Sequence, residues 1–366
     1  MDPVARFTPQ PLKLGFMTHA ISAGSPKATY DELIELFVAA DELGIDCGFI
    51  AQHHFAGPAA GQLPSPLVFL AAAAARTERI HLGTAASVLP VEDPVRLAED
   101  VAVLDALSNG RVELGVGTGG ANLARYGAFG KAASDASRLH FEHLEVLLSV
   151  LAGEPRGGVD ASLTPGTPSI APRVWGAHGS EASARLAARH GVGLMFGTAD
   201  LDARSVQRPI VEAYLDEWDQ HGAELAPAAF RPQLHPRLGA IRMVFPSTSR
   251  EAAKREAGKM LEAQAFRVAH ARGVSVDDLT LDDVIDGLNS HLGHPDEIVE
   301  SLLKDPALLG FVEYFIPVLS GAASDALPGT RLDQTIRSLE LIATQIAPEL
   351  GWVPTHARVA QEPQHV

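Results

Sequence analysis

The chain has 366 residues, 46% of them hydrophobic, which is long for most single domains but ordinary for an α/β barrel with one sizeable core. Its formal net charge of −16 and the lack of any Lys/Arg cluster argue against nucleic acid or a membrane surface as a partner. The single cysteine, Cys47, excludes an intrachain disulfide, and with no apolar leader in the sequence we expect a cytoplasmic protein.

Short β-prone segments alternate with helical patterns along the whole chain. They lie at 12–18, 47–53, 80–88, 111–117, 173–178, 192–197, 238–245 and 311–318. Eight such alternations predict a single-domain (β/α)8 barrel over residues 12–350, with polar tails at 1–11 and 351–366. A doubly wound open sheet is the alternative, but the number of strands and the missing GxGxxG fingerprint count against it.

The helix boundaries carry recognisable signals. The first helix is predicted to begin at a capping box, Thr29-x-x-Glu32. Two later helices are predicted to begin at a capping residue followed by proline, namely Ser65-Pro66 and Asp93-Pro94. The last helix is expected over Arg331 to Ile346.

The longest interval between strands runs from about 246 to 310, between the seventh and eighth strands. It is expected to carry extra helices, including one over Asp282 to His291. Such an insertion leaves the barrel at the C-terminal end of a strand, where barrel active sites lie. It is therefore either a lid that shapes the substrate site or a packed helical subdomain.

The stretch 49–120 carries the strongest functional signal. It places Gln-His-His at 52–54, Gly-Thr-Ala-Ala at 83–86 and Gly-Val-Gly-Thr-Gly-Gly at 115–120, each where a predicted strand ends. These motifs, in this order, resemble those of the bacterial luciferase-like, flavin-dependent monooxygenases. The resemblance implies the (β/α)8 fold and an FMN site at the C-terminal ends of the strands.

His53 is the candidate catalytic residue. In the luciferase family the first His of this motif lies beside the reactive edge of the flavin, and imidazole can donate or accept a proton near neutral pH. Without the resemblance, a lone His at a strand end is more often a structural residue with its hydrogen bonds satisfied. Adjacent side chains on a strand point in opposite directions, so His53 and His54 do not make a metal site, and no metal is expected. Gln52 stands where luciferase has Glu.

The resemblance also implies a homodimer. In luciferase the second His of the motif meets a Glu of the partner subunit, and the matching residues here are His54 and Glu99. We expect the two to pair across a subunit interface. The alternative is a monomer in which His54 is exposed to solvent.

The residues expected around the flavin ring follow from the same resemblance. Thr84, Ala85 and Ala86 would lie behind the isoalloxazine ring, with a cis peptide bond between the two alanines. Small side chains at this point allow the backbone to approach a flat ring. Gly197 and Thr198, at the end of the sixth predicted strand, would lie on the other side of the flavin.

The residues expected around the phosphate depart from the family pattern. Gly117 and Thr118 stand where luciferase has a cysteine and an Arg that binds the phosphate. Thr offers one hydroxyl in place of a bidentate cation, so phosphate affinity must come from elsewhere or be weaker. Gly179, Ser180 and Ser183 match phosphate-binding positions at the start of a predicted helix. Simple N-capping by Ser180 is the alternative.

The resemblance implies a monooxygenase with a separate NAD(P)H:flavin reductase. Reduced FMN would react with O2 to give a C4a-hydroperoxide, which would oxygenate a small organic substrate. The sequence does not identify that substrate, because the resemblance fails over 199–309. Two alternatives remain: an F420-dependent oxidoreductase on the same fold, and a non-catalytic FMN-binding protein, which Thr118 in place of Arg mildly favours.

Overall fold

The computed structural model describes residues 10–21, 25–57, 61–155, 162–197, 202–308, 312–319 and 330–359. Parallel strands form a closed (β/α)8 barrel, because the last strand pairs with both the first and the seventh. The barrel strands are β1 (Lys13–Thr18), β2 (Cys47–Ile50), β3 (His81–Thr84), β5 (Val112–Gly117), β6 (Val174–Ala177), β7 (Gly193–Phe196), β8 (Leu238–Pro246) and β10 (Tyr314–Val318). The barrel prediction is confirmed, and the alternative of an open sheet is wrong.

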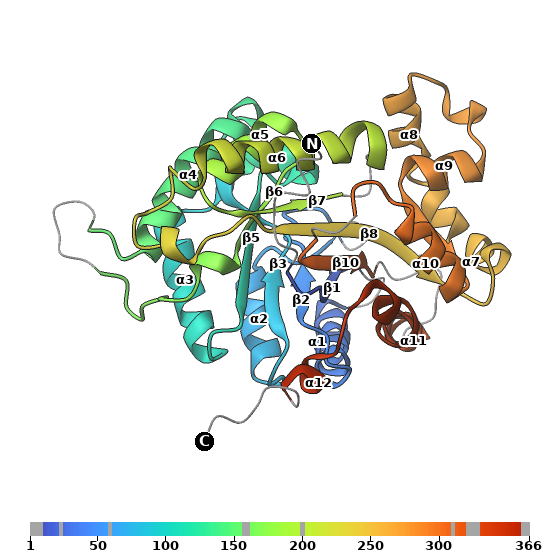
Figure 1. The fold of residues 1–366 in the computed structure, drawn as a ribbon, viewed down its shortest axis with the longest axis horizontal. Coiled ribbons are helices and arrows are strands. Elements are labelled where there is room, and N and C mark those ends of the chain that lie inside the picture. Colours follow the sequence, from blue (N-terminus) through green and yellow to red (C-terminus); the bar gives the residue numbers. More distant parts are fainter. Residues whose placement is uncertain are drawn as a thin grey trace.

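Helices surround this barrel (Figure 1). They are α1 (Pro26–Glu42), α2 (Pro66–Ala74), α3 (Pro94–Leu107), α4 (Ala136–Leu151), α5 (Glu181–Arg189), α6 (Arg208–His221), α10 (Pro295–Leu303) and α11 (Thr330–Leu341). Outward-facing residues such as Leu14, Phe16 and Leu82 pack with the helices in one large core. Inward-facing residues such as Phe49, Trp175 and Ile316 fill the barrel itself. None of the helices in the described ranges has the length and hydropathy needed to cross a bilayer.

Local capping chemistry explains where two of these helices begin. Asp93 caps α3 as predicted, by accepting from two backbone N–H groups of the first turn. Helix α1 begins earlier than expected, at Pro26, and its cap is Ser25. The predicted capping box from Thr29 to Glu32 is therefore wrong. Thr29 already lies inside the first turn, where its hydroxyl donates back to the Ser25 carbonyl (3.1 Å).

The segment between β8 and β10 forms a lobe at one side of the barrel (Figure 1). It contains α7 (Arg250–Glu262), α8 (Ala265–Arg272), α9 (Leu281–Gly287), a short strand β9 (Ser290–Gly293) and α10. The helix expected over Asp282 to His291 is wrong in its second half. It ends at Gly287, Asn289 adopts a positive φ of 48°, and the chain then pairs in parallel with the end of β8.

The segment after residue 350 packs on the base of the barrel as far as residue 359. The buried Trp352 donates its indole N–H to Asp46 Oδ2 (2.7 Å), and Arg358 forms an ion pair with the same carboxylate. Arg358 belongs to α12 (Thr355–Val359), whose first residue, Thr355, donates its hydroxyl to the Gly44 carbonyl (2.5 Å). Residues 1–9 and 360–366 of the expected tails lie outside the described residues.

Candidate active site at the C-terminal mouth of the barrel

The barrel brings the three motifs of the 49–120 stretch to one sector of its C-terminal mouth. Strand β2 pairs with β3, with Ile50 opposite Thr84, and β3 pairs with β5. After the Ala85-Ala86 step, the short strand β4 (Ser87–Val88) continues along β5, with Val88 opposite Gly117. The strand ends that carry His53, Ala85-Ala86 and Gly117 are therefore neighbours.

Three small residues form one wall of this sector. The peptide bond between Ala85 and Ala86 is cis, as the resemblance implies. A Cβ atom at Gly117 would lie 3.4 Å from the methyl groups of both Ala86 and Ala177. We call Ala86, Gly117 and Ala177 the small-residue cradle. Because Gly117 has no side chain, nothing from position 117 fills the space beside the methyl groups of Ala86 and Ala177. This suits the close approach of a flat ligand.

The hydroxyl of Thr84 belongs to the barrel wall. It donates to the Gly115 carbonyl (2.6 Å) and accepts from the Gly115 N–H (3.0 Å). The side chain is fully buried, and a Cβ at Gly115 would overlap the Thr84 carbonyl oxygen. Thr84 thus fastens β3 to β5 directly beneath the cradle, and any contact it makes with a ligand would come from its backbone.

His53 follows the C-terminal end of β2 and is held there by its own loop. Its backbone N–H donates to the Leu63 carbonyl (3.0 Å), and its ring packs against Gly61, where a Cβ would lie 2.7 Å from the ring Cγ. Gly61 has a φ of 126°, so glycine meets both the backbone and the packing requirement. The ring Nδ1 of His53 is buried without a hydrogen-bond partner among the described residues.

The surroundings of His53 keep its imidazole neutral. Burial lowers its pKa below 6.5, and the nearby positive charges of Arg125 and of protonated His54 lower the pKa further. A second imidazole, His19 at the end of β1, meets the His53 ring edge to face with 5.2 Å between ring centroids. The sequence analysis missed His19, although it stands at a strand end just as His53 does.

A polar clamp fixes the backbone around the histidine pair. Asn122 accepts from the His54 N–H (2.9 Å) and donates to the Gln52 carbonyl (3.2 Å). The side chain of Gln52 is buried, accepts from the Val88 N–H (2.6 Å) and donates to Glu92 (2.7 Å). Glu92 thus provides a carboxylate close to the motif, although Gln52 stands where luciferase has Glu. The sequence analysis did not identify Asn122 or Glu92.

His54 and Glu99 are not brought together within one chain. His54 is 8% exposed, its ring lies edge to face on Phe129 (4.8 Å between centroids), and its Nε2 is buried without a partner among the described residues. The alternative in which His54 is exposed to solvent therefore disagrees with the burial of its side chain. Glu99 lies on α3, is 46% exposed and forms an ion pair with Arg96.

The positions expected at the phosphate lie at the start of α5. Ser180 caps this helix by accepting from the Ser183 N–H (3.3 Å), and the two hydroxyl oxygens are 2.8 Å apart. Ser180 and Gly179 are exposed. The capping role is therefore present, and it leaves the N-terminus of α5 open to solvent. Thr118 is partly buried, and its carbonyl accepts from the Tyr126 hydroxyl (2.6 Å).

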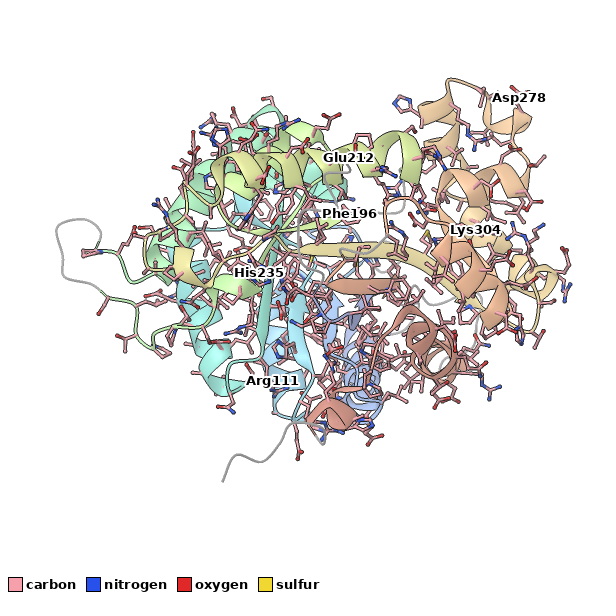
Figure 2. All side chains as sticks on the ribbon, viewed as in Figure 1. Arg111, Phe196, Glu212, His235, Asp278 and Lys304 are labelled. Carbon is pink, nitrogen blue, oxygen red and sulfur yellow. The ribbon has the colours of Figure 1, made fainter. Side chains whose placement is uncertain are left out.

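Position 197, which follows β7, requires glycine because of its backbone conformation and its close neighbours. Its φ is 82°, and a Cβ there would overlap the guanidinium of Arg242 and lie 2.6 Å from the Ile241 carbonyl oxygen. Arg242 is fully buried, pairs with Asp305 (2.7 Å) and lies 5.4 Å from the centre of the Phe196 ring. Phe196 is labelled in Figure 2. Thr198 lies outside the described residues.

These features define an α/β-barrel protein with a site at the C-terminal mouth, where enzymes of this fold carry their active sites. Within the described ranges, no three His, Cys, Asp or Glu side chains are arranged to hold a metal ion. A family model described as luciferase-like monooxygenase matches residues 13–310. The chain therefore belongs to the luciferase-like monooxygenase family.

Individual relatives agree with this assignment. Uncharacterized protein y4wF from Sinorhizobium fredii is 31% identical over 256 residues, which cover 67% of this chain and 70% of that protein. The 4-hydroxyprotoasukamycin monooxygenase of Streptomyces nodosus subsp. asukaensis is 28% identical over 350 residues, 89% of this chain and 91% of the relative.

Two solved structures show the range of proteins that share the fold. The oxygenating constituent of 3,6-diketocamphane monooxygenase from Pseudomonas putida, in complex with FMN, has a TM-score of 0.71 at 20% identity, covering 92% of this chain and 98% of that one. The coenzyme F420-dependent tetrahydromethanopterin reductase of Methanopyrus kandleri has a TM-score of 0.65 at 15% identity, with coverage of 93% and 99%.

Proposed function

We propose that this protein is a monooxygenase that uses reduced FMN and O2 to oxygenate a small organic substrate. The observation that carries the proposal is the small-residue cradle at the ends of β3, β5 and β6, together with the imidazole of His53, whose pKa is lowered by burial and whose Nδ1 is buried without a partner among the described residues. A relative aligned over 89% of the chain is named a monooxygenase, which supports the reaction class. The structural neighbour in complex with FMN supports the cofactor.

The residues at the mouth fit a flavin. The cradle of Ala86, Gly117 and Ala177 would contact the ring, because the side-chain atoms nearest to a Cβ at position 117 are the methyl groups of the two alanines. Ser180, Ser183 and the N-terminus of α5 would bind the phosphate, since helix N-termini carry free N–H groups and a partial positive charge. When bound, reduced FMN supplies the electrons with which O2 is activated.

The chain's own contribution is orientation, water exclusion and proton handling. Below the mouth, the apolar side chains of Met17, Ala51, Ala85 and Val318 belong to the cluster that fills the barrel, so water is excluded from that side. A neutral His53 carries one N–H donor and one acceptor nitrogen. It can therefore hydrogen-bond to oxygen near the flavin edge and also take up a proton.

The assembly and the source of electrons belong to the same proposal. We infer a two-component system in which a separate NAD(P)H:flavin reductase supplies reduced FMN; the Pseudomonas putida neighbour, which is the oxygenating constituent of its monooxygenase, supports a division into components. We also infer a homodimer in which the buried, unpartnered Nε2 of His54 meets Glu99 of the partner subunit.

The decisive experiment is an anaerobic binding titration followed by isotope labelling. The purified protein would be titrated with reduced FMN, oxidised FMN and F420, and substrate turnover would then be tested with 18O2. We expect reduced FMN to bind and one 18O atom to enter the product. Binding of F420 instead would support a hydride-transferring oxidoreductase, which the F420-dependent neighbour keeps as the second candidate.

A matched pair of variants tests the phosphate assignment. Ser180→Ala removes the cap of α5, and Ser249→Ala removes an equivalent serine cap from α7, far along the chain in the lobe. Each cap removal should cost about 1 kcal/mol of stability. Only Ser180→Ala should weaken FMN binding. Equal FMN affinity for both variants would contradict the phosphate site. Tight FMN binding without oxygen transfer to any substrate would favour a binding protein.

A further inference from the structure

A single buried amide binds the backbone on both sides of His53. The Oδ1 atom of Asn122 accepts from the His54 N–H (2.9 Å), and its Nδ2 donates to the Gln52 carbonyl (3.2 Å). These groups belong to the two peptide units that flank the Cα atom of His53. Because each peptide unit is planar, the positions of these two units set the direction in which the His53 side chain leaves the backbone.

The burial of this region makes the two hydrogen bonds hard to replace. Asn122 is 5% exposed, and the side chains of Gln52 and His54 are buried as well. A buried backbone N–H or carbonyl that loses its partner is costly. An amide offers an acceptor and a donor at once, whereas aspartate would accept without donating and leucine would do neither. Asparagine therefore meets both backbone requirements with one side chain.

The same short helix binds the backbone at a third point. Asn122 and Arg125 belong to the 3-10 helix over Gly120–Phe129, which follows β5. Residues three apart lie on one face of a 3-10 helix. From that face, Arg125 Nε donates to the Phe55 carbonyl (3.3 Å). One face of the helix thus binds the chain directly before and directly after the two histidines.

The start of this 3-10 helix is itself fixed to the barrel. Gly119 has a φ of 72°, and a Cβ there would lie 2.6 Å from a methyl group of Val88, so glycine is required. The Asn122 N–H donates to the Gly119 carbonyl (2.5 Å), and the Tyr126 hydroxyl donates to the Thr118 carbonyl (2.6 Å). Asn122 is therefore held from the β5 side and does not follow movements of the His53 loop.

The backbone just after the two histidines has a conformation that the surroundings must maintain. Phe55 has a φ of 51°, which is unusual for a bulky residue and costs free energy. Its side chain is 73% exposed, so burial of the ring does not compensate for this conformation. The hydrogen bond from Arg125 to the Phe55 carbonyl and that from His54 to Asn122 hold this part of the chain.

We propose that Asn122 is a positioning residue for His53, because its two hydrogen bonds keep the imidazole packed against Gly61 and the His19 ring. The inference rests on the proposed function, in which His53 handles a proton at the flavin. Asn122 acts through the backbone and contacts neither flavin nor substrate. Without its two bonds, the peptide units on both sides of His53 can turn, and the ring leaves its place.

The test follows the His53 ring in the protein without flavin. Histidine ring signals of the isotope-labelled protein would be assigned from their loss in His53→Gln and His19→Phe. The first readout is the nuclear Overhauser contact between the two rings, whose centroids are 5.2 Å apart. The second is the pKa of His53, which burial, and then Arg125 and His54, hold below 6.5. We expect Asn122→Ala to lose the contact and to raise the pKa of His53 toward 6.5, because the released ring meets water.

Two further variants separate positioning from stability. Asn122→Leu keeps the side-chain volume but makes neither hydrogen bond, and it serves if Asn122→Ala does not fold. The control is Thr167→Val, which removes a buried hydrogen bond from the Thr167 hydroxyl to the Leu151 carbonyl (3.1 Å). Thr167 precedes β6 and therefore lies at the opposite end of the barrel from His53. Thr167→Val should lower the free energy of unfolding in urea, as the Asn122 variants do, and leave both His53 readouts unchanged.

The two readouts decide the proposal together. Loss of the ring contact and a raised pKa of His53 in the Asn122 variants, with Thr167→Val unchanged, would establish the positioning role. Wild-type readouts in either folded Asn122 variant would overturn it, and so would the same changes in Thr167→Val, which would trace them to lost stability. Because the measurement uses no flavin, failure of FMN to bind would refute the proposed function while the result on the orientation of His53 would stand.

Discussion

The small-residue cradle makes Gly117→Val the sharpest test of where a flavin ring lies. The new Cβ would stand 3.4 Å from the methyl groups of Ala86 and Ala177, an ordinary van der Waals distance, and Gly117 ends a β-strand, where valine is well accommodated. The free energy of unfolding should therefore change by less than about 1 kcal/mol. The two γ-methyl groups, however, would extend into the space that the ring needs.

The expected loss of affinity depends on how much apolar contact the ring loses. If the methyl groups separate the ring from these three residues, about 100 Å² of apolar contact is lost, which at about 25 cal/mol per Å² is about 2.5 kcal/mol, or roughly 70-fold in Kd. The assay is a fluorescence titration with FMN, paired with urea unfolding. Gly120→Val is the matched control, because Gly120 is exposed and a Cβ there meets nothing within 4 Å. Wild-type FMN affinity in a folded Gly117→Val protein would refute the placement of the ring.

Three further predictions concern the barrel wall, the proposed dimer interface and the pH dependence of stability. Gly115→Ala should lower the free energy of unfolding in urea by about 2–4 kcal/mol, because its Cβ overlaps the Thr84 carbonyl and breaks two hydrogen bonds; a loss below 1 kcal/mol would contradict the packing. Glu99→Ala should raise the dimer Kd by about tenfold in sedimentation by leaving His54 unpaired, and a wild-type monomer at micromolar concentration would exclude the pairing. Burial, helped by two nearby histidines, lowers the pKa of His178 to about 3. The pKa of His178 in the unfolded chain is about 6.5, so the stability that the neutral buried ring contributes is fully present above pH 6.5. By pH 5 the free energy of unfolding should fall by about 2 kcal/mol, because the unfolded chain binds a proton that the folded protein does not. His178→Phe should remove this loss from the pH dependence of unfolding.

Much of the barrel can be predicted from sequence because each strand and helix is locally self-consistent. The Asp93 cap, the proline that begins α3 and the alternation of strands with amphipathic helices all follow from contacts within a few residues. The strand ends at His53, Ala85 and Gly117 follow as well, since parallel strands place their carboxyl ends at one face. The site sector is therefore predictable as a set of strand ends.

The errors arise where partners distant in sequence decide the outcome. Residues 290–293 form a strand because β8 extends beyond the barrel and offers an unpaired edge, which no local pattern reveals. Residues 351–359 pack on the barrel because the buried Asp46 carboxylate needs Trp352 and Arg358, more than 300 positions away. His19 meets His53 for a similar reason, since the pairing of β1 with β2 brings together two strand ends that lie far apart in sequence.

The substitution at Gln52 illustrates how a residue change can leave the chemistry of a site in place. Read from sequence, glutamine in place of glutamate removes a carboxylate next to His53 and leaves its protonation uncertain. In the fold, Gln52 points into the wall, its amide satisfies Val88 and Glu92, and its carbonyl is held by Asn122. The protonation of His53 is instead governed by burial and by Arg125, which both disfavour the imidazolium form. A protonated ring would have no acceptor nitrogen, whereas the neutral ring has one donor and one acceptor nitrogen. A proton-handling role at the flavin therefore needs His53 neutral, and the burial that lowers its pKa meets that need without a carboxylate at position 52.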